Sequence, residues 1–323
     1  MRIQGSLSIS LALGAALTII GGASAQISSS RPVKIVVPFA AGGAVDALAR
    51  FLGDEIRRSE GMTVVIEDRP GAGTVIGTEA VSHAQSDGHT LLMTANSFVI
   101  NPHLKKLPYD ALSSFEPVCL LARSPHVLVV AADSPYRTLG ELIDAARAKP
   151  GELTMAANGP ATAHHIAFEM LQRAANVKIT FVPYPGPAPA ATALLGGHVA
   201  SANVDLAVVA EHLKSGKLRA LAVLSRERIE AFPNVPTAIE AGLNGVEMEG
   251  TLGIVAPAGT PKEIISQLTT WLTTALRAPA MQAKLVSQGL DSVGMCGADF
   301  GTYLQKQYDE YGRIIRQANI HIN

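Results

Sequence analysis

The sequence has little charge and no excess of basic residues, which argues against a nucleic-acid partner. Its 323 residues include 26 lysines and arginines and 27 aspartates and glutamates, giving a formal net charge of −1. Proteins that bind nucleic acid normally carry a clustered basic surface. We therefore expect no nucleic-acid partner, and any acidic ligand has to be held by local features of the fold.

Cysteine is scarce, and the catalytic motifs that can be read from a sequence are missing. The two cysteines, Cys119 and Cys296, follow no metal-binding spacing. They could pair in an oxidising compartment or remain buried thiols, and sequence does not decide between these states. There is no G-x-S-x-G nucleophile motif and no H-E-x-x-H zinc motif. We therefore expect no enzyme activity, no cofactor and no metal site.

Long apolar runs are absent except at the N-terminus. Residues 7–20 are almost all apolar, Arg2 is the only charged side chain near them, and Ala23-Ser24-Ala25 resembles a cleavage site. This pattern predicts a signal peptide over residues 1–25, a mature chain beginning at Gln26 and a periplasmic location. The alternative, a retained membrane anchor, is disfavoured because the run is shorter than the ~20 residues that span a bilayer.

The rest of the chain alternates between strand-like and helix-like patterns. Strands are predicted over residues 63–66, 90–93, 127–131, 179–182 and 218–224. A capping box at residues 138–141 starts one helix, and Pro261 is expected at the first position of another. After about residue 283 only helical patterns are evident, including residues 300–315. Such alternation predicts an α/β fold with mainly parallel sheets, whose ligands gather at the carboxyl ends of the strands.

The most informative stretch runs from residue 33 to residue 50. A strand ends at Pro38, Gly42-Gly43 make a turn, and a helix with apolar residues at three- and four-residue intervals follows. The first-turn N–H groups of a helix have no intrahelical partner and suit an anion. A dinucleotide fingerprint would need three glycines, so we favour a simple anion site. Asp46 would repel an anionic ligand, and we expect it to fold back and cap the glycine loop.

A second turn of this kind covers residues 158–165. It follows a short strand, precedes a helix, and places the hydroxyl of Thr162 at the helix start. His164 and His165 invite a metal or catalytic interpretation, but neighbours on a helix point about 100° apart and do not readily bind one ion. We expect His165 to cap or pack.

Several motifs make the chain resemble the Bug family, the periplasmic solute-binding receptors of tripartite tricarboxylate transporters. The similarity covers residues 31–319 and rests on these segments: Pro38-Phe39 with Gly42-Gly43, Asp46-Ala47-Leu48-Ala49-Arg50, Arg69-Pro70-Gly71-Ala72-Gly73, Asp87-Gly88-His89-Thr90, Leu107-Pro108-Tyr109-Asp110, Pro183-Tyr184, Ser215-Gly216-Lys217-Leu218-Arg219 and Ala256-Pro257-Ala258-Gly259-Thr260-Pro261.

The resemblance implies an α/β, two-lobed periplasmic binding protein of type 2-like architecture, with two mainly parallel sheets flanked by helices and a ligand cleft between the lobes. It assigns residues 26–123 and 247–323 to lobe 1 and residues 124–246 to lobe 2. It also implies a carboxylate held between residues 39–44 and 159–162 with the help of ordered waters, and a membrane permease as partner. Thr251 departs from the family, which often has tryptophan there.

These arguments predict a receptor for a small carboxylate, which could be a di- or tricarboxylate, an amino acid or an aromatic acid. It would serve a tripartite tricarboxylate-type transporter as a monomer. The alternatives are a ligand sensor for a two-component system and a periplasmic hydrolase that uses His164 or His165. The predicted ligand-binding residues are Phe39, Ala40, Ala41, Gly42, Gly43, Ala44, Asp46, Asn96, Ser97, Gly159, Ala161, Thr162, His165, Tyr184 and Asn203.

Overall fold

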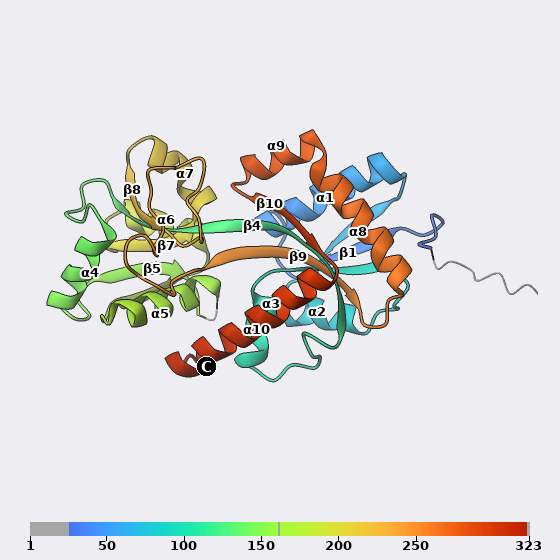
Figure 1. The fold of residues 1–323 in the computed structure, drawn as a ribbon, viewed down its shortest axis with the longest axis horizontal. Helices are drawn as coiled ribbons and strands as arrows, with labels where there is room; N and C mark the ends of the chain where they lie inside the picture. Colours follow the sequence, from blue (N-terminus) through green and yellow to red (C-terminus); the bar gives the residue numbers. More distant parts are fainter. Residues whose placement is uncertain (1–25, 161, 322–323) are drawn as a thin grey trace, which may run out of the picture.

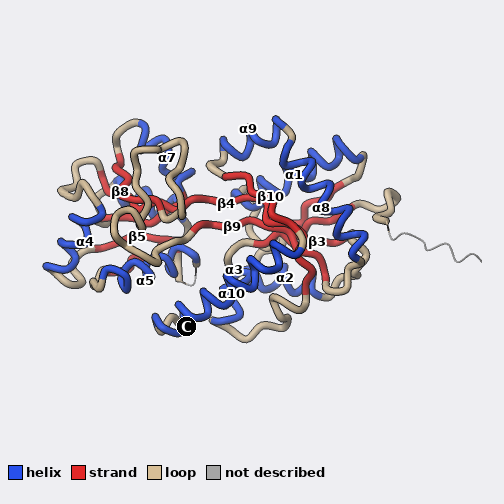
Figure 2. Tube along the Cα trace, in the orientation of Figure 1, coloured by secondary structure: helices blue, strands red, loops and turns tan. Residues whose placement is uncertain are grey.

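The computed structural model describes residues 26–160 and 162–321. The predicted signal peptide and Ala161 lie outside these residues. Within them the elements form two groups, joined across the middle by long strands (Figure 1). Strands lie in the interior of each group and helices cover the outside (Figure 2).

The first group is built from the N-terminal segment. Its elements are β1 (Val33–Val37), α1 (Ala44–Glu60), β2 (Val64–Asp68), the 3₁₀ turn η1 (Ala72–Thr74), α2 (Val75–Ser82), β3 (Thr90–Thr94), α3 (Ser97–Ile100) and the 3₁₀ turn η2 (Asn101–His103). The predicted strands at 63–66 and 90–93 correspond to β2 and β3. Leu48, Leu52 and Ile56 of α1 are buried, as their spacing predicted.

The second group follows the long strand β4 (Phe115–Ala131). Its elements are α4 (Leu139–Ala148), β5 (Thr154–Asn158), α5 (Ala163–Ala175), β6 (Thr180–Tyr184), α6 (Pro187–Leu195), β7 (Ser201–Asp205), α7 (Leu206–Lys214) and β8 (Leu218–Val223). The chain then returns through β9 (Glu249–Pro257), α8 (Lys262–Arg277), α9 (Pro279–Ser287), β10 (Asp291–Cys296) and α10 (Ala298–Ala318), the last of which contacts both α3 and α5.

The sheet is mixed, which corrects the expectation of mainly parallel pairing. The β1/β2, β1/β3, β5/β6 and β5/β7 pairs are parallel, as expected for strands joined by helices. The long strands pair antiparallel: β9 with β3, and β4 with β7, β8, β9 and β10. One sheet therefore runs through both groups, and the predicted lobe boundary after residue 123 falls inside β4. The assignment of segments to two lobes stays a prediction.

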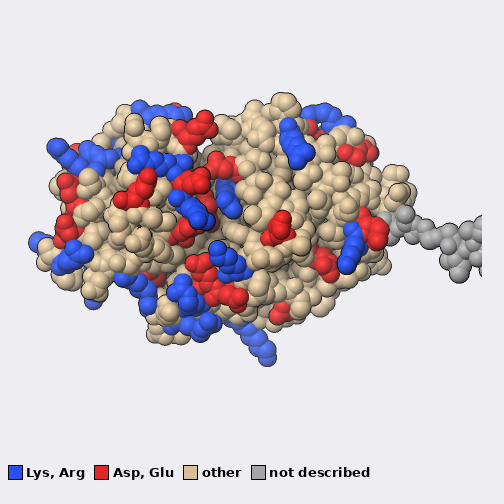
Figure 3. Space-filling view, in the orientation of Figure 1, with Lys and Arg blue, Asp and Glu red and all other residues tan. Residues whose placement is uncertain are grey.

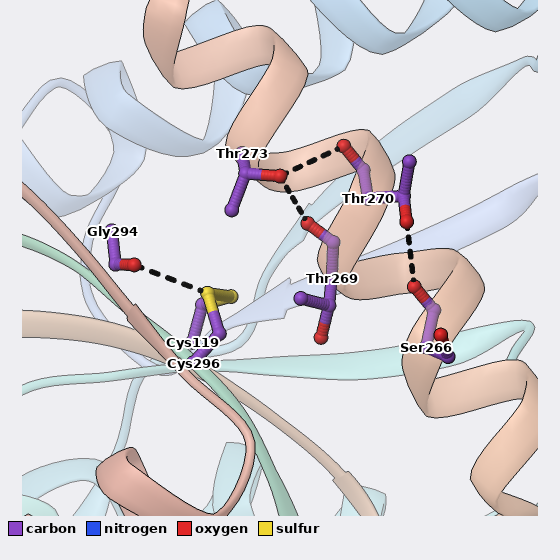
Figure 4. The surroundings of a disulfide bond; sticks show 7 residues. All are labelled: Cys119, Ser266, Thr269, Thr270, Thr273, Gly294 and Cys296. Carbon is purple, nitrogen blue, oxygen red and sulfur yellow. Dashed lines mark hydrogen bonds between the residues drawn. A yellow bond between two sulfur atoms is a disulfide. The ribbon is translucent and has the colours of Figure 1, made fainter.

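A disulfide joins Cys119 of β4 to Cys296 of β10, across 177 residues of sequence (Figure 4). This settles the question that the spacing of the two cysteines left open. It also corrects the expectation of helices alone in the C-terminal segment, since β10 lies there and contacts α8, the helix drawn beside the disulfide in Figure 4. The bond fixes the last strand and the helix that follows it to the centre of the sheet.

Of the two helix starts predicted from the capping box and from Pro261, the first is confirmed and the second is wrong. Thr138 caps α4 by accepting a hydrogen bond from the Glu141 amide at 3.2 Å, as the capping box predicted. In α8 the helix begins at Lys262, so Pro261 is the N-cap residue and not the first helical residue. The hydroxyl of Thr260 donates to the Pro257 carbonyl oxygen at 2.7 Å, because the preceding turn competes with the helix for it.

On the face drawn in Figure 3, acidic and basic side chains are interspersed over the middle of the molecule. In the part of the chain that the structure describes, no helix combines the length and the apolar character needed to cross a membrane.

Candidate functional site

A cavity of about 590 Å³ lies where elements of the two groups meet. Part of its wall comes from residues at or just after the ends of β1, β3, β5 and β7, the position where ligands collect in α/β folds. The first residues of α1, α5, α6 and α7 also face it. The positive ends of several helix dipoles therefore point at one space.

The start of α1 leaves its first amide groups open to the cavity. The N-cap residue Gly43 has no side chain with which to cap, and both Gly43 and the next residues, Ala44 and Val45, line the cavity. In an α-helix the N–H groups of these first residues have no intrahelical acceptor. They are therefore available to a ligand.

Asp46 holds the glycine loop, as predicted. One carboxylate oxygen accepts a hydrogen bond from the Gly42 amide at 2.7 Å, and the other forms an ion pair with Arg50 at 2.7 Å. Burial alone would raise the pKa of Asp46, but the Gly42 hydrogen bond and the Arg50 guanidinium together lower it. Gly42 has φ +86, a conformation that favours glycine. The carboxylate is not among the groups that line the cavity.

The start of α5 is capped by its own N-cap residue. The hydroxyl of Thr162 accepts from the His165 amide at 3.3 Å and donates to the Gly159 carbonyl oxygen at 2.9 Å. The hydroxyl proton of Thr162 is therefore already engaged within its own loop. The side chain of Asn203 supports the same turn, since its amide nitrogen donates to the His164 carbonyl oxygen at 3.1 Å.

A cluster of polar side chains from β4, α5 and β7 forms another part of the cavity wall. Asp205, at the end of β7, lies 3.4 Å from Nε2 of His164 and 3.6 Å from Nε2 of His126, and it accepts a hydrogen bond from the Ser124 hydroxyl at 3.0 Å. Burial and the neighbouring His164 lower the pKa of His126 to about 3, so His126 is neutral. Burial opposes ionisation of Asp205, yet the two imidazoles and Ser124 hold its pKa far below the usual range.

This cluster does not have the geometry of a catalytic triad or of a preformed metal site. The Ser124 hydroxyl donates to the carboxylate, so no histidine is placed to accept its proton. Ligand atoms of His126, His164 and Asp205 lie within 4.8 Å of one another. However, the two imidazole rings stack at 3.9 Å with planes only 13° apart, and the lone pairs of parallel rings lie in separate planes. One ring would have to rotate before both could bind one ion.

A further part of the cavity wall is made by β9 and the segment around the end of α9, where the chain returns to the first group. Asn96 uses its side chain to hold them together, donating to the Tyr311 hydroxyl at 2.9 Å and to the Glu249 carbonyl oxygen at 3.0 Å. The turn after α9 also contacts α7. A Cβ atom placed on Gly289 would lie 2.6 Å from the Cβ atom of Ala207. The two groups therefore touch closely beside the cavity.

The predicted residues divide into two sets. Those that line the cavity are Phe39, Gly43, Ala44, Asn96, Ser97 and Thr162, and those that do not are Ala40, Ala41, Gly42, Asp46, Gly159, His165, Tyr184 and Asn203. The ring of His165 instead stacks on Phe181 with a centroid separation of 4.4 Å, in accord with the packing role expected for it. Ligand contact by any of these residues stays a prediction.

Sequence reasoning missed Ser124, His126 and Asp205, and considered His164 only as a metal-binding or catalytic candidate. Ser124 and His126 precede the apolar run at 127–131, and the prediction began the strand after them, whereas β4 includes both. Asp205 ends a strand directly before a helix, the same position that drew attention to the turns after β1 and β5. That position was the signal that could have found it.

Comparison with known proteins agrees with this geometry. Residues 48–320 match the model of the tripartite tricarboxylate transporter family receptor, TctC. The protein BugT of Bordetella pertussis is 34% identical over 298 residues, covering 91% of each chain. The structure of the periplasmic binding protein BugD is 33% identical, covers 90% of this chain and 98% of its own, and has a TM-score of 0.76.

A structure from R. palustris, Rpa4515 with adipate, is 30% identical, covers 90% of this chain and 98% of its own, and has a TM-score of 0.79. These findings confirm the predicted α/β periplasmic binding protein fold and the resemblance to Bug proteins. The chain belongs to the family of tripartite tricarboxylate transporter receptors.

Proposed function

We propose that this protein is a periplasmic receptor that binds a small carboxylate in the cavity, with the carboxylate group at the start of α1. The observation that carries the proposal is the uncapped first turn of α1, where Gly43, Ala44 and Val45 face the cavity. Among the described residues that line the cavity there is no lysine or arginine. Backbone amides and helix dipoles are therefore the groups that attract an anion.

Backbone amides and helix dipoles can together account for micromolar affinity. A hydrogen bond to a charged oxygen contributes about 1.5 to 3 kcal/mol, and each helix dipole adds about 0.3 to 1 kcal/mol. Micromolar binding corresponds to about 8 kcal/mol. Three or four amide contacts with two helix starts reach this value, and the ordered loop held by Asp46 reduces the entropy lost on binding.

Family membership supports the cellular setting of the proposal. The protein would act in the periplasm after removal of residues 1–25, as a monomer that delivers its ligand to the membrane permease of a tripartite tricarboxylate-type transporter. Binding of adipate by the R. palustris relative supports a carboxylate as the ligand class. A sensing role would use the same cavity and differs only in the partner. The absence of a triad geometry at Ser124 and Asp205 supports a binding role over hydrolysis.

The test is calorimetry with carboxylates selected by a thermal-shift screen, since a ligand that binds only the folded state raises the melting temperature. The decisive variant is Gly43→Pro. The φ of −82 at Gly43 suits proline, and a Cβ atom there would come no closer than 3.8 Å to its nearest neighbour, so the main change is loss of one amide donor. We expect affinity to fall roughly tenfold or more, the cost of one hydrogen bond to a charge.

The matched control is Lys262→Pro, which places proline at the first position of α8, an exposed helix start that does not line the cavity. This variant should bind like the parent. Equal affinity of the parent and a folded Gly43→Pro variant would show that the carboxylate does not lie at the start of α1. Failure of every carboxylate in the screen would overturn the proposed function itself.

A further inference from the structure

Asp205 is the one carboxylate side chain among the described residues that line the cavity. The other titratable groups of that lining are the imidazoles of His126 and His164. No lysine or arginine of the described lining balances the carboxylate. A receptor for anions thus has a fixed negative charge on the wall of its binding site.

The contacts of Asp205 hold its carboxylate in the cavity wall. The residue is the N-cap of α7, but its side chain makes no capping hydrogen bond and turns toward Ser124 and the two histidines. The Ser124 hydroxyl is its one hydrogen-bond donor at 3.0 Å among the described residues, while the imidazole nitrogens stay at 3.4 and 3.6 Å. About one fifth of the side chain remains exposed, at 21%. The carboxylate therefore keeps acceptor capacity for a group that enters the cavity.

The two histidines are buried beside this carboxylate. Nδ1 of His126 is buried and has no hydrogen-bond partner among the described residues, whereas Nε2 of His164 faces the Asp205 carboxylate at 3.4 Å. His126 is 1% exposed and His164 is 6% exposed. A buried polar atom without a partner is costly unless a ligand or a rearrangement satisfies it.

We propose that Asp205, backed by His126 and His164, receives a protonated amine of the ligand, so that the bound carboxylate belongs to an amino acid or another amino carboxylic acid. This inference rests on the proposed function, because it assigns the second polar group of the same ligand. An ammonium group has three donors and a positive charge, and it matches a carboxylate that is 21% exposed and accepts one hydrogen bond, from the Ser124 hydroxyl.

A dicarboxylate fits this cavity less well. With its first carboxylate at the start of α1, its second would face Asp205 or lie against the apolar side chains of Phe39, Val45 and Leu252. Neither surrounding contains a lysine or an arginine among the described residues, and two like charges in a water-poor site repel strongly. The charge on the wall therefore selects against dianions.

The test compares matched ligands by calorimetry on the intact mature protein. One series pairs β-alanine, 4-aminobutyrate, 5-aminovalerate and 6-aminohexanoate with malonate, succinate, glutarate and adipate. A second pairs the common 2-amino acids with their 2-hydroxy analogues. We expect at least one amino compound to bind about 100-fold more tightly than its matched partner, as for a buried charge pair.

The variant Asp205→Asn then identifies the group responsible. It should weaken the preferred amino compound roughly 100-fold and leave or improve the affinity of its dicarboxylate or hydroxy partner. The control Asp291→Asn removes a carboxylate that does not line the cavity and should leave both affinities unchanged. Because the ligand series is measured first on the parent protein, the comparison holds even if a variant is unstable.

Each outcome is decisive. Tighter binding of a dicarboxylate or a hydroxy acid than of its amino partner would overturn this inference and leave the proposed function intact. Binding that is lost in EDTA and restored by Zn²⁺ would assign the cluster to a metal ion and also overturn it. Binding of no carboxylate from either series would overturn the proposed function.

Discussion

Replacing Asp46 with asparagine should destabilise the protein and weaken ligand binding. The substitution keeps the shape of the side chain and an oxygen for the Gly42 amide, but it removes the charge. A hydrogen bond to a charged group contributes about 1.5 to 3 kcal/mol against about 1 kcal/mol for a neutral one. Arg50 is 49% exposed, so its ion pair with Asp46 adds at most about 1 kcal/mol.

We therefore expect a loss of about 1 to 2 kcal/mol in the free energy of unfolding at pH 7. The neighbouring Asp68 moderates the loss, since burial and the charge of Asp46 raise the pKa of Asp68 and the substitution relieves that repulsion. The contribution of Asp46 to the free energy of unfolding should decrease as the pH falls. Because its pKa is lowered on folding, its stabilisation is complete above 3.8, the unfolded value, and disappears as pH falls through the lower folded value.

The assay is urea unfolding of the parent and Asp46→Asn between pH 7 and pH 3.5, with ligand titration at pH 7. The difference in unfolding free energy should be constant down to about pH 5 and shrink below it. Asp54→Asn is the control on the same helix, since the Asp54 pair with Arg57 is exposed and should contribute less than about 0.5 kcal/mol. Equal stability of the parent and Asp46→Asn at pH 7 would refute the anchoring role of Asp46.

Three further predictions concern other parts of the chain. Replacing both Cys119 and Cys296 with serine should lower the unfolding free energy by about 2 to 4 kcal/mol in urea titrations, and an unchanged value would show that the disulfide does not stabilise the fold. Gly289→Ala should weaken ligand binding in calorimetry, because its Cβ would meet Ala207 and push the two groups of elements apart beside the cavity. Gly245→Ala is the control for backbone strain, because Gly245 also has a positive φ but a Cβ atom added there would meet nothing within 4 Å. Equal effects of the two substitutions on binding would show that the contact with Ala207 is not responsible. N-terminal sequencing of periplasmic protein should begin at Gln26, and a retained Arg2 would contradict the predicted cleavage.

The features that could be predicted from sequence depend on residues close together in the chain. The fold-back of Asp46 onto Gly42 spans four residues, and the Thr162 cap on the His165 amide spans three. Helix starts after strands follow from turn residues and apolar spacing. The first turns of α1 and α5 could therefore be identified as candidate anion sites before their convergence on one cavity was known.

The long central strand could not be predicted in the same way. Only residues 127–131 have a clear strand pattern, whereas β4 extends from Phe115 and contains Pro117 and Pro125. Its register shifts at two places against β9. Pairing with strands more than a hundred residues away supplies hydrogen bonds that override the local pattern. The same pairing, with the disulfide, makes a strand of the polar, glycine-containing segment β10.

The two parts of the cavity wall differ in predictability because they are made of different groups. The start of α1 offers backbone amides, which any helix start provides and a local pattern reveals. The cluster of Asp205, His126 and His164 is made of side chains from β4, α5 and β7, and no local pattern in the sequence indicates that these three segments meet. His126 and Asp205 are brought together by the antiparallel pairing of β4 with β7, where they are register partners. An aspartate at a strand end looks like an ordinary helix cap until that pairing places two imidazoles beside it. Local patterns can therefore indicate that an anion binds, whereas the choice among anions depends on contacts that only the folded sheet creates.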